Sequence, residues 1–237
     1  MWDNPRLLNA AANLLAASAA LALLYAALQL LLRSPLFPLR EVTLHGALAH
    51  TARADVEHAV AGRMGGNFFA ADLAAMRAGL EQLPWVRRAQ LRRVWPDRIE
   101  VTLEEHVALA QWGDADLVNT HGEQFRARSA QRLPVFAGPA GSASEVASRF
   151  RRFSALLAPL GETPERVILT PRYAWQLRLA SGLNLELGRD GAETVEQRLA
   201  RFVAAWPDSL GRLQRRPMHV DLRYPNGFAL RVPEWSG

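Results

Sequence analysis

Apolar and polar positions divide the chain into an N-terminal apolar segment and a longer, patterned region. Residues 7–32 carry no charged side chain. A helix of that length, at about 1.5 Å per residue, is long enough to cross a hydrocarbon core of roughly 30 Å. Beyond Pro38, apolar residues recur at alternating or helical spacing, which is typical of folded domains with one face in water. The pattern therefore predicts one membrane-spanning helix followed by a folded region.

A cleaved signal peptide is the alternative interpretation of the apolar segment. A signal peptide has a shorter apolar region that ends at a small-residue cleavage site. Here the apolar run continues through residues 28–32 and meets Arg33-Ser34-Pro35. Its length favours an uncleaved anchor. The flanking charges do not decide the orientation, because Arg6 on one side stands against Arg33 and Arg40 on the other.

The residues after the span predict a small domain with the element order β-α-α-β-β. A strand at residues 42–44 leads to a helix that Thr51 can cap, and a second helix starts near Asp72. Two alternating runs, residues 86–94 and 99–103, complete the domain as a hairpin.

Two tryptophans flank the first strand of this hairpin. Trp85 precedes it, and Trp95 opens the Trp95-Pro96-Asp97 turn that follows it. Aromatic side chains of this size bury a large apolar area when they are internal. We expect both tryptophans in the core between the helices and the sheet. The alternative is that one of them is exposed and available for a partner.

The remaining residues predict a second, mixed α/β domain built on a largely antiparallel sheet. Alternating runs bounded by turn residues indicate strands, and two longer runs with helical spacing indicate helices. The expected elements are a hairpin within residues 115–125, a helix at about 144–160, strands at 166–170, 174–179 and 183–187, a helix at 193–206, and a closing hairpin of residues 218–224 and 228–232. The fold class is therefore α+β.

Composition excludes several kinds of chemistry. The chain has 28 basic and 23 acidic residues, a net charge of +5, and every basic residue is arginine. Because lysine and cysteine are both absent, lysine nucleophiles, the phosphate-loop lysine, thiol nucleophiles and disulfides are excluded. Of the arginine clusters at residues 87–93 and 149–152, the first is split by strand-like alternation and lacks interleaved aromatics, whereas single-strand nucleic-acid binding needs an extended basic groove with aromatic platforms. We interpret them as solvated faces and expect no nucleic-acid partner.

No motif in the sequence indicates catalysis. The six histidines are scattered, without the spacing of a metal site. No nucleophile-elbow or glycine-rich phosphate motif occurs. We therefore expect no catalytic residue, no metal, no cofactor and no small-molecule substrate.

Motifs in both domains resemble those of one family. The first domain resembles a POTRA (polypeptide-transport-associated) domain through Val42-Thr43-Leu44-His45-Gly46, Gly65-Gly66-Asn67-Phe68, Leu83-Pro84-Trp85-Val86, residues 92–97 and residues 99–105. The second matches through Trp175-Gln176-Leu177, Leu187-Gly188-Arg189 and residues 220–224. Together with the preceding span, these segments resemble the FtsQ family of bacterial division proteins over nearly the whole chain.

The resemblance implies an organisation and a role. It implies a short cytoplasmic tail at residues 1–6, a transmembrane helix at 7–32, a POTRA domain at 36–106 and an FtsQ-type β domain at 107–237. The chain would be a single-pass inner-membrane protein with a cytoplasmic N-terminus and a periplasmic C-terminal region. Its β domain would hold FtsB and FtsL, and its POTRA domain would contact other division proteins.

Two alternative functions stay open at this point. POTRA domains also occur in envelope transport and secretion, so an adaptor of that kind is one alternative. A cell-wall hydrolase is the other, because the resemblance places the chain beside peptidoglycan. Such an enzyme would need two positioned carboxylates, and no pair stands out from the charged surface.

The closing hairpin is the predicted partner-binding surface. Its last strand would lie at the sheet edge, where unpaired backbone groups accept an added strand. Alternation places Phe228, Leu230 and Val232 on one face of that strand. By resemblance, the FtsB-binding surface also includes the positions matched by Arg189 and Tyr224. The candidate residues are Arg189, Tyr224, Asn226, Gly227, Phe228, Leu230 and Val232. In the alternative interpretation, Tyr224 only completes the domain's own sheet and Arg189 caps a turn.

Overall fold

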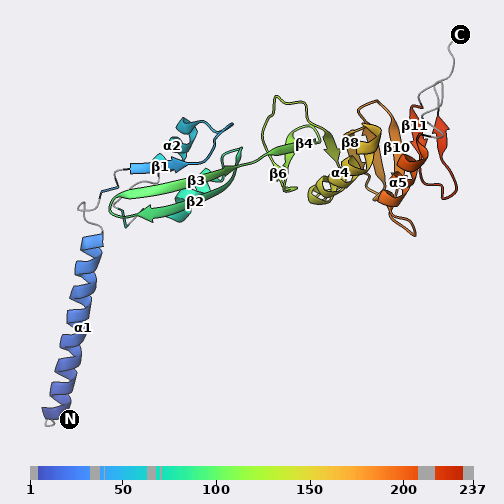
Figure 1. Ribbon diagram of the computed structural model, residues 1–237. Coiled ribbons are helices and arrows are strands. Elements are labelled where there is room, and N and C mark those ends of the chain that lie inside the picture. Colours follow the sequence, from blue (N-terminus) through green and yellow to red (C-terminus); the bar gives the residue numbers. More distant parts are fainter. Residues whose placement is uncertain are drawn as a thin grey trace. The chain divides into compact units, whose positions relative to one another are not determined.

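A computed structural model describes residues 5–32, 38–39, 41–62, 68–69, 71–207 and 217–231. The chain divides into two units, one ending at Glu105 and the other beginning at His106, and each is described by itself (Figure 1). The glycine link predicted at residues 65–67 and the candidate Val232 lie outside the described residues.

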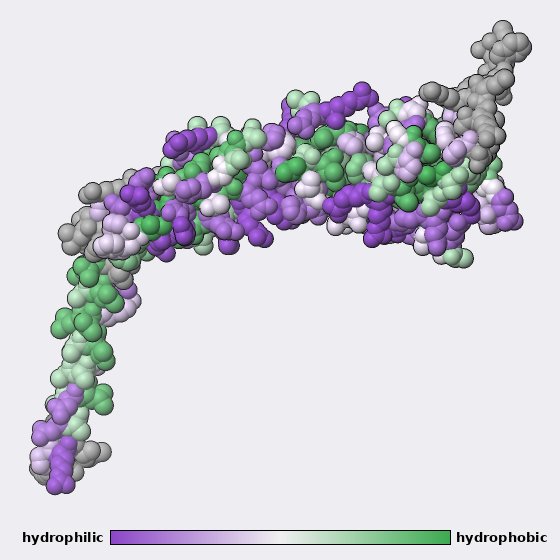
Figure 2. All heavy atoms as spheres, in the orientation of Figure 1, coloured by the Kyte–Doolittle hydropathy of each residue, from purple (hydrophilic) through white to green (hydrophobic). Residues whose placement is uncertain are grey.

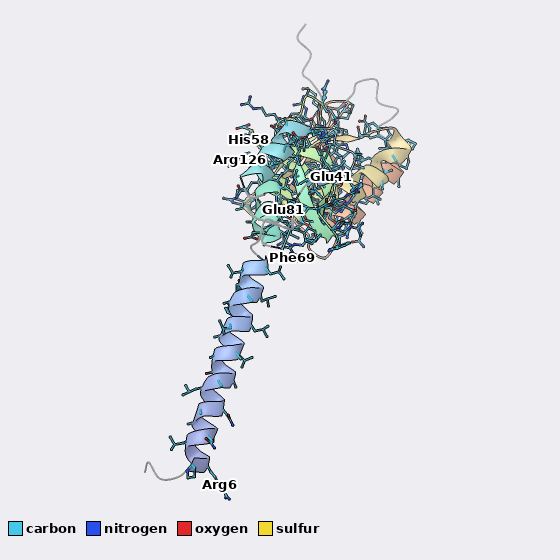
Figure 3. The ribbon with its side chains drawn as sticks, turned by 90° about the vertical axis from the view of Figure 1, so that its left-hand side faces the viewer. Arg6, Glu41, His58, Phe69, Glu81 and Arg126 are labelled. Carbon is cyan, nitrogen blue, oxygen red and sulfur yellow. The ribbon has the colours of Figure 1, made fainter. Side chains whose placement is uncertain are left out.

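Helix α1 (Pro5–Leu32) is the N-terminal apolar segment. Its stretch Leu8–Leu31 has a mean hydropathy of 2.1 and is long enough to cross a membrane. No part of that stretch is buried, and side chains project from the helix in every direction (Figure 3). Figure 2 shows this helix as a largely hydrophobic surface. A helix that is apolar all round is stable only where other apolar groups cover it, as lipid does. Among the described residues, α1 is the one candidate membrane span.

The first unit has the predicted β-α-α-β-β order. Its sheet has the strand order β1-β3-β2, with β1 parallel and β2 antiparallel to β3. The elements are β1 (Glu41–His45), α2 (Arg53–Ala61), α3 (Leu73–Leu80), β2 (Val86–Val94) and β3 (Arg98–Glu105). The core between the helices and the sheet consists of Val56, Val60, Ala71, Met76, Leu80, Val86, Ala89, Ile99, Val101 and Leu103.

Helix α3 begins as predicted, but α2 does not. The Asp72 carboxylate accepts hydrogen bonds of 3.0 Å from the backbone N–H groups of Ala74 and Ala75, a standard N-cap. The expectation that Thr51 caps α2 is wrong, since the N-cap position is Ala52 and no side chain caps it. The backbone N–H of Thr51 instead donates to the Glu105 carboxylate, with a nitrogen-to-oxygen distance of 2.7 Å.

Glu105, the last residue of β3, fastens the loop before α2. Its carboxylate also accepts hydrogen bonds from the backbone N–H groups of Ala49 (2.8 Å) and His50 (3.2 Å). Burial alone would raise the pKa of Glu105, but the hydrogen bonds from residues 49–51 outweigh burial and lower the pKa. Helix α2 therefore has no local capping side chain, and the loop before it is held instead by the Glu105 carboxylate, about fifty residues away in the chain.

The two tryptophans differ in environment. Trp85 is half-buried, and its ring stacks on His50 with centroids 3.8 Å apart. Trp95 is 74% exposed, so the expectation that it belongs to the core is wrong. It follows the last residue of β2, in the turn to β3, where the chain has passed the end of the helix-covered sheet.

The second unit is built on one largely antiparallel sheet of nine described strands, in the order β12-β11-β10-β9-β8-β7-β4-β5-β6. Helices α4 and α5 contact each other and pack on one face of it. The elements are β4 (Ala108–Trp112), β5 (Asp116–Asn119), β6 (Gln124–Phe125), β7 (Val135–Ala137), α4 (Ala143–Leu157) with the 3-10 turn η1 (Ala158–Leu160), β8 (Pro164–Leu169), β9 (Trp175–Leu179), β10 (Asn184–Gly188), α5 (Val195–Ala205), β11 (His219–Asp221) and β12 (Ala229–Arg231).

Burial alternates along the central strands of this sheet. Val167 and Leu169 of β8, Leu177 of β9 and Leu185 of β10 are buried toward the helices. The residues between them are half-buried or exposed. Side chains of successive strand residues point to opposite faces, so the second face of the sheet is largely polar, and no helix of the described residues covers it.

The tryptophan environments lead to a stability prediction. We expect Trp95→Ala to change the free energy of unfolding by less than about 0.5 kcal/mol, because the side chain is exposed. Trp85→Ala should cost about 1–2 kcal/mol, less than a fully buried tryptophan, because half of its ring packs. Urea unfolding of the full chain in neutral detergent, followed by circular dichroism, measures both. Equal losses for the two variants would contradict the assigned environments.

Candidate partner-binding surface

Strand β12 forms one edge of the nine-stranded sheet. It pairs antiparallel with β11, with Ala229 opposite Asp221 and Arg231 opposite His219. All three of its residues are exposed. Within the described part of the chain, no strand pairs with its outer side. Its outward backbone groups are therefore free to template an added strand.

The two faces of β12 have different surroundings. Leu230 lies opposite the buried Val220, on the side of α5, and is 40% exposed. Phe228, two residues earlier, is half-buried on that side and meets Phe202 of α5 edge to face, with centroids 5.9 Å apart. Ala229 and Arg231 point to the helix-free face. Of the apolar candidates, Phe228 therefore packs mainly within its own unit, and Leu230 is accessible.

Arg201 of α5 holds the segment between β11 and β12. Its guanidinium donates hydrogen bonds of 2.9 Å to the backbone carbonyls of Tyr224 and Pro225. It also forms an ion pair with Glu193 at 3.0 Å. The predicted strand at residues 218–224 is shorter than expected, ending at Asp221, so Tyr224 does not complete the sheet. Its side chain is 53% exposed beside the edge strand.

Asp221 and Arg223 form a two-point ion pair at the end of β11. The Arg223 Nε and Nη2 donate to Asp221 at 2.9 Å and 2.6 Å. The hydrogen bond from the Arg223 side chain is the main reason that the pKa of Asp221 is lowered, although burial opposes it. The same contact raises the pKa of Arg223. The ion pair fixes the direction of the Arg223 side chain, which was not among the residues predicted to contact a partner.

Arg189 lies directly beyond β10, beside this ion pair. At the preceding Gly188, φ is +74°, and an added Cβ would stand 2.9 Å from Arg223 Cγ. Because Gly188 has no side chain, the aliphatic part of Arg223 can pack against the backbone just before Arg189. The Arg189 carbonyl accepts a 2.7 Å hydrogen bond from Arg198 of α5. Its guanidinium is exposed and has no partner among the described residues.

The structure brings most of the predicted residues together at one end of the sheet. Asn226 and Gly227 lie in the turn before β12, with Asn226 exposed. Sequence reasoning missed Arg223 and the two α5 arginines that position the loops, Arg198 and Arg201. A signal existed for Arg223, because residues two apart on a strand share a face and Asp221 could pair with it. The helix arginines gave no comparable signal.

The described residues contain no group of three or more His, Asp or Glu side chains that could hold a metal ion. This end of the sheet combines backbone hydrogen-bonding groups at an edge, the exposed side chains of Arg189 and Arg223, and an exposed phenol ring.

Comparison with known proteins decides the family. The family model "POTRA domain, FtsQ-type" matches residues 37–106, and "Cell division protein FtsQ/DivIB, C-terminal" matches residues 110–223. The chain belongs to the FtsQ family of cell division proteins. The cell division protein FtsQ of Burkholderia pseudomallei is 46% identical, covering 98% of this chain and 94% of the relative. That of Nitrosospira multiformis is 44% identical over 98% of this chain and 99% of the relative. That of Bordetella pertussis is 38% identical over 98% and 93%.

Membership of the FtsQ family confirms the resemblance read from the motifs and favours a role in division over one in envelope transport. The predicted fold class is also confirmed, with one apolar N-terminal helix, a POTRA domain and a mixed domain on a mostly antiparallel sheet.

The Asp221–Arg223 pair leads to a pH-dependent prediction. Because the folded-state pKa of Asp221 lies below the ordinary 3.8, its contribution is present above that value and is lost as pH falls through the lowered pKa. We expect Asp221→Asn to lower the free energy of unfolding by about 1 kcal/mol at neutral pH, a modest value because Arg223 is largely exposed. The difference from the unmodified chain should shrink toward zero in strong acid.

Urea unfolding at about pH 7 and about pH 2.5 measures this difference. Asp114→Asn, at an exposed turn residue of the same unit, is the control. A difference for Asp221→Asn that is the same at both pH values would contradict the assigned role of the ion pair.

Proposed function

We propose that the chain is a non-enzymatic, single-pass scaffold of the cell-division complex in the inner membrane. In this proposal residues 1–6 are cytoplasmic, residues 7–32 cross the membrane, and the POTRA domain (36–106) and β domain (107–237) are periplasmic. The apolar helix α1 and the family support the proposal. The chain would link early and late division proteins without chemistry of its own.

The observation that carries the proposal is the exposed edge strand β12 beside Arg189, Arg223 and Tyr224. We infer that FtsB adds a strand to this edge, with FtsL held in the same assembly. Main-chain hydrogen bonds would supply affinity, and side chains on alternate positions would supply specificity. The residues proposed to contact the partner are Arg189, Tyr224, Asn226, Gly227, Phe228, Leu230 and Val232.

Charge adds a second element of recognition. Arg189 has no ion-pair partner among the described residues, and it lies beside Arg223. Guanidinium groups bind carboxylates with two parallel hydrogen bonds, a geometry that selects acidic segments. The incoming strand should therefore be flanked by an acidic residue. Arg198 and Arg201 would act as positioning residues, since they hold the loops that carry Arg189 and Tyr224.

The first unit supports a separate contact in this proposal. Both β1 and the nine-residue β2 are edge strands of its sheet. We infer that the POTRA domain uses one of these exposed surfaces to meet division proteins other than FtsB and FtsL.

The membrane topology can be tested directly. A reporter enzyme that is active only in the periplasm, fused after Gly237, should be active in cells, because the folded region lies beyond the single span. A reporter that is active only in the cytoplasm should be silent at the same position. The reverse pattern would overturn the orientation and the division scaffold with it.

The partner surface can be tested by substitution. Tyr224→Ala and Arg189→Glu should each weaken FtsB binding by more than about tenfold, or roughly 1.4 kcal/mol, because each removes a side chain beside the edge strand. Binding of the purified full chain to FtsB, measured by titration in detergent, gives the affinity. Both residues are exposed, so the thermal transition should not change.

Matched controls lie in the turn between β8 and β9. Tyr173→Ala removes a tyrosine that is 61% exposed, and Arg172→Glu reverses an exposed arginine. Both controls should bind FtsB normally. Normal binding by Tyr224→Ala and Arg189→Glu as well would rule out this surface as the main contact.

A further inference from the structure

A row of mostly polar and cationic side chains crosses the helix-free face of the second unit. Each residue in the row is the register partner of the next, so the row runs across seven adjacent strands from β4 to β12. Its members are Gln111, Val135, Arg166, Arg178, Asn184, His219 and Arg231. We call this set the cross-strand row.

The row faces away from α4 and α5. Its central members alternate with Val167, Leu177 and Leu185, which are buried under the helices. Arg166 and Arg178 are exposed on the opposite side. The row therefore lies on a sheet face that no described helix covers.

Arg166 and Arg178 stand directly opposite each other in the antiparallel β8–β9 pair. Side chains in such positions start about 5 Å apart, and two like charges there destabilise the pair. Neither guanidinium has a partner among the described residues. Since no hydrogen bond or ion pair within the described residues offsets this cost, the pair indicates an anion that comes from outside.

The nearest acidic group does not neutralise the two arginines. Glu165 already accepts a 2.7 Å hydrogen bond from Arg132. That bond is the main reason that the pKa of Glu165 is lowered, with smaller contributions from the charges of Arg132, Arg178 and Arg166. With Glu186, which lines a hollow beside the same pair, two carboxylates face three guanidinium groups, and the local charge stays positive.

Two shallow hollows meet at the arginine pair. One, of about 250 Å³, is lined by Gln176, Asn184, Glu186 and His219 in addition to the pair. The other, of about 360 Å³, includes Gln111 and Val135. Hydrogen bonds hold both amides of the first hollow, from Gln176 to Glu186 (2.9 Å) and from Asn184 to the Met218 carbonyl (3.1 Å). A ligand here would be polar, anionic and narrow enough to follow the row.

We propose that the cross-strand row binds an extended, acidic polypeptide segment that lies across the strands. Neighbouring strands are about 4.8 Å apart, so Arg178 and Arg231, three strands from each other, are separated by roughly 14 Å. In an extended chain, side chains four residues apart are separated by about the same distance. Carboxylates at positions i and i+4 would therefore reach both arginines.

The neighbouring row distinguishes a polypeptide from a membrane surface. Glu186 and Asp221 occupy register positions one row away from Asn184 and His219 on the same face. Asp221 is neutralised by Arg223, but the Glu186 carboxylate would repel a flat anionic lipid surface, whereas a single extended segment can follow the row of arginines. The site goes beyond the edge-strand contact proposed above, because Arg166 and Arg178 lie on β8 and β9, away from β12.

The test uses the full chain in neutral detergent and two fluorescent twelve-residue peptides, one alternating Glu and Ser, the other alternating Gln and Ser. The Glu peptide should bind at low salt, and the Gln peptide should not. The double variant Arg166→Gln/Arg178→Gln should bind the Glu peptide at least about tenfold more weakly, because two charge-assisted contacts are lost. Arg178→Gln alone should lose about half of that effect on a logarithmic scale.

The matched control is Arg128→Gln/Arg172→Gln, which removes two exposed arginines elsewhere in the unit. It should bind the Glu peptide within about twofold of the unmodified chain. Equal losses in both double variants would show non-specific charge attraction and overturn the proposal. So would binding of inorganic phosphate or anionic-lipid vesicles, lost in the Arg166/Arg178 variant, without binding of the peptide.

The outcome is separable from the edge-strand proposal. Arg166→Gln/Arg178→Gln should bind FtsB normally, and Tyr224→Ala should bind the Glu peptide normally. The Arg166/Arg178 variant should also melt at the same temperature as the unmodified chain or higher, because a like-charge pair is removed. A lower melting temperature would show that the pair is structural and would overturn its assignment to a ligand.

Discussion

The β12 end of the second unit depends on the contacts that Arg201 makes with the segment after β11. The Arg201 guanidinium donates hydrogen bonds to the backbone carbonyls of Tyr224 and Pro225, and it forms an ion pair with Glu193. Backbone carbonyls that leave a sheet need partners, and here a helix side chain supplies them. The turn into β12 is thereby held against α5, which keeps the edge strand paired on one side and open on the other. A single planar donor group suits this task because its N–H groups point in fixed directions.

The arginine-only composition takes on meaning in this setting. Arg198 and Arg201 of helix α5 donate hydrogen bonds to backbone carbonyls of neighbouring loops and strands. Arg223 forms an ion pair with Asp221. In the first unit, Arg93 donates to the carbonyls of Phe68 and Ala71. A lysine carries one compact ammonium group and could not make several fixed contacts of this kind. Many arginines of this chain are therefore structural donors, whereas Arg166, Arg178 and Arg189 are among those with no side-chain partner in the described residues.

Local patterns predicted most of the elements, but not the short strands β4 and β7, and they did not predict contacts between distant residues. The apolar run of α1, the start of α3 near Asp72 and the alternating strands are properties of short segments, and periodicity reveals them. The loop before α2 is held by Glu105, at the far end of the unit, and no local signal links Thr51 to it. Trp95 looked like a core residue by size, yet its position in a turn beyond the sheet exposes it. The cross-strand row was invisible for the same reason, since register between strands places its members together.

The two proposed surfaces meet at Arg231. It is the last member of the cross-strand row and also a residue of the edge strand β12. A strand added to β12 would extend the sheet by one position and place a side chain of the partner opposite Arg231 on the helix-free face. An acidic side chain there would neutralise Arg231 and shorten the positive row, whereas a neutral one would leave it complete. The partner residue opposite Arg231 therefore decides whether binding at the β12 edge weakens binding of an acidic segment at the cross-strand row or leaves it unchanged.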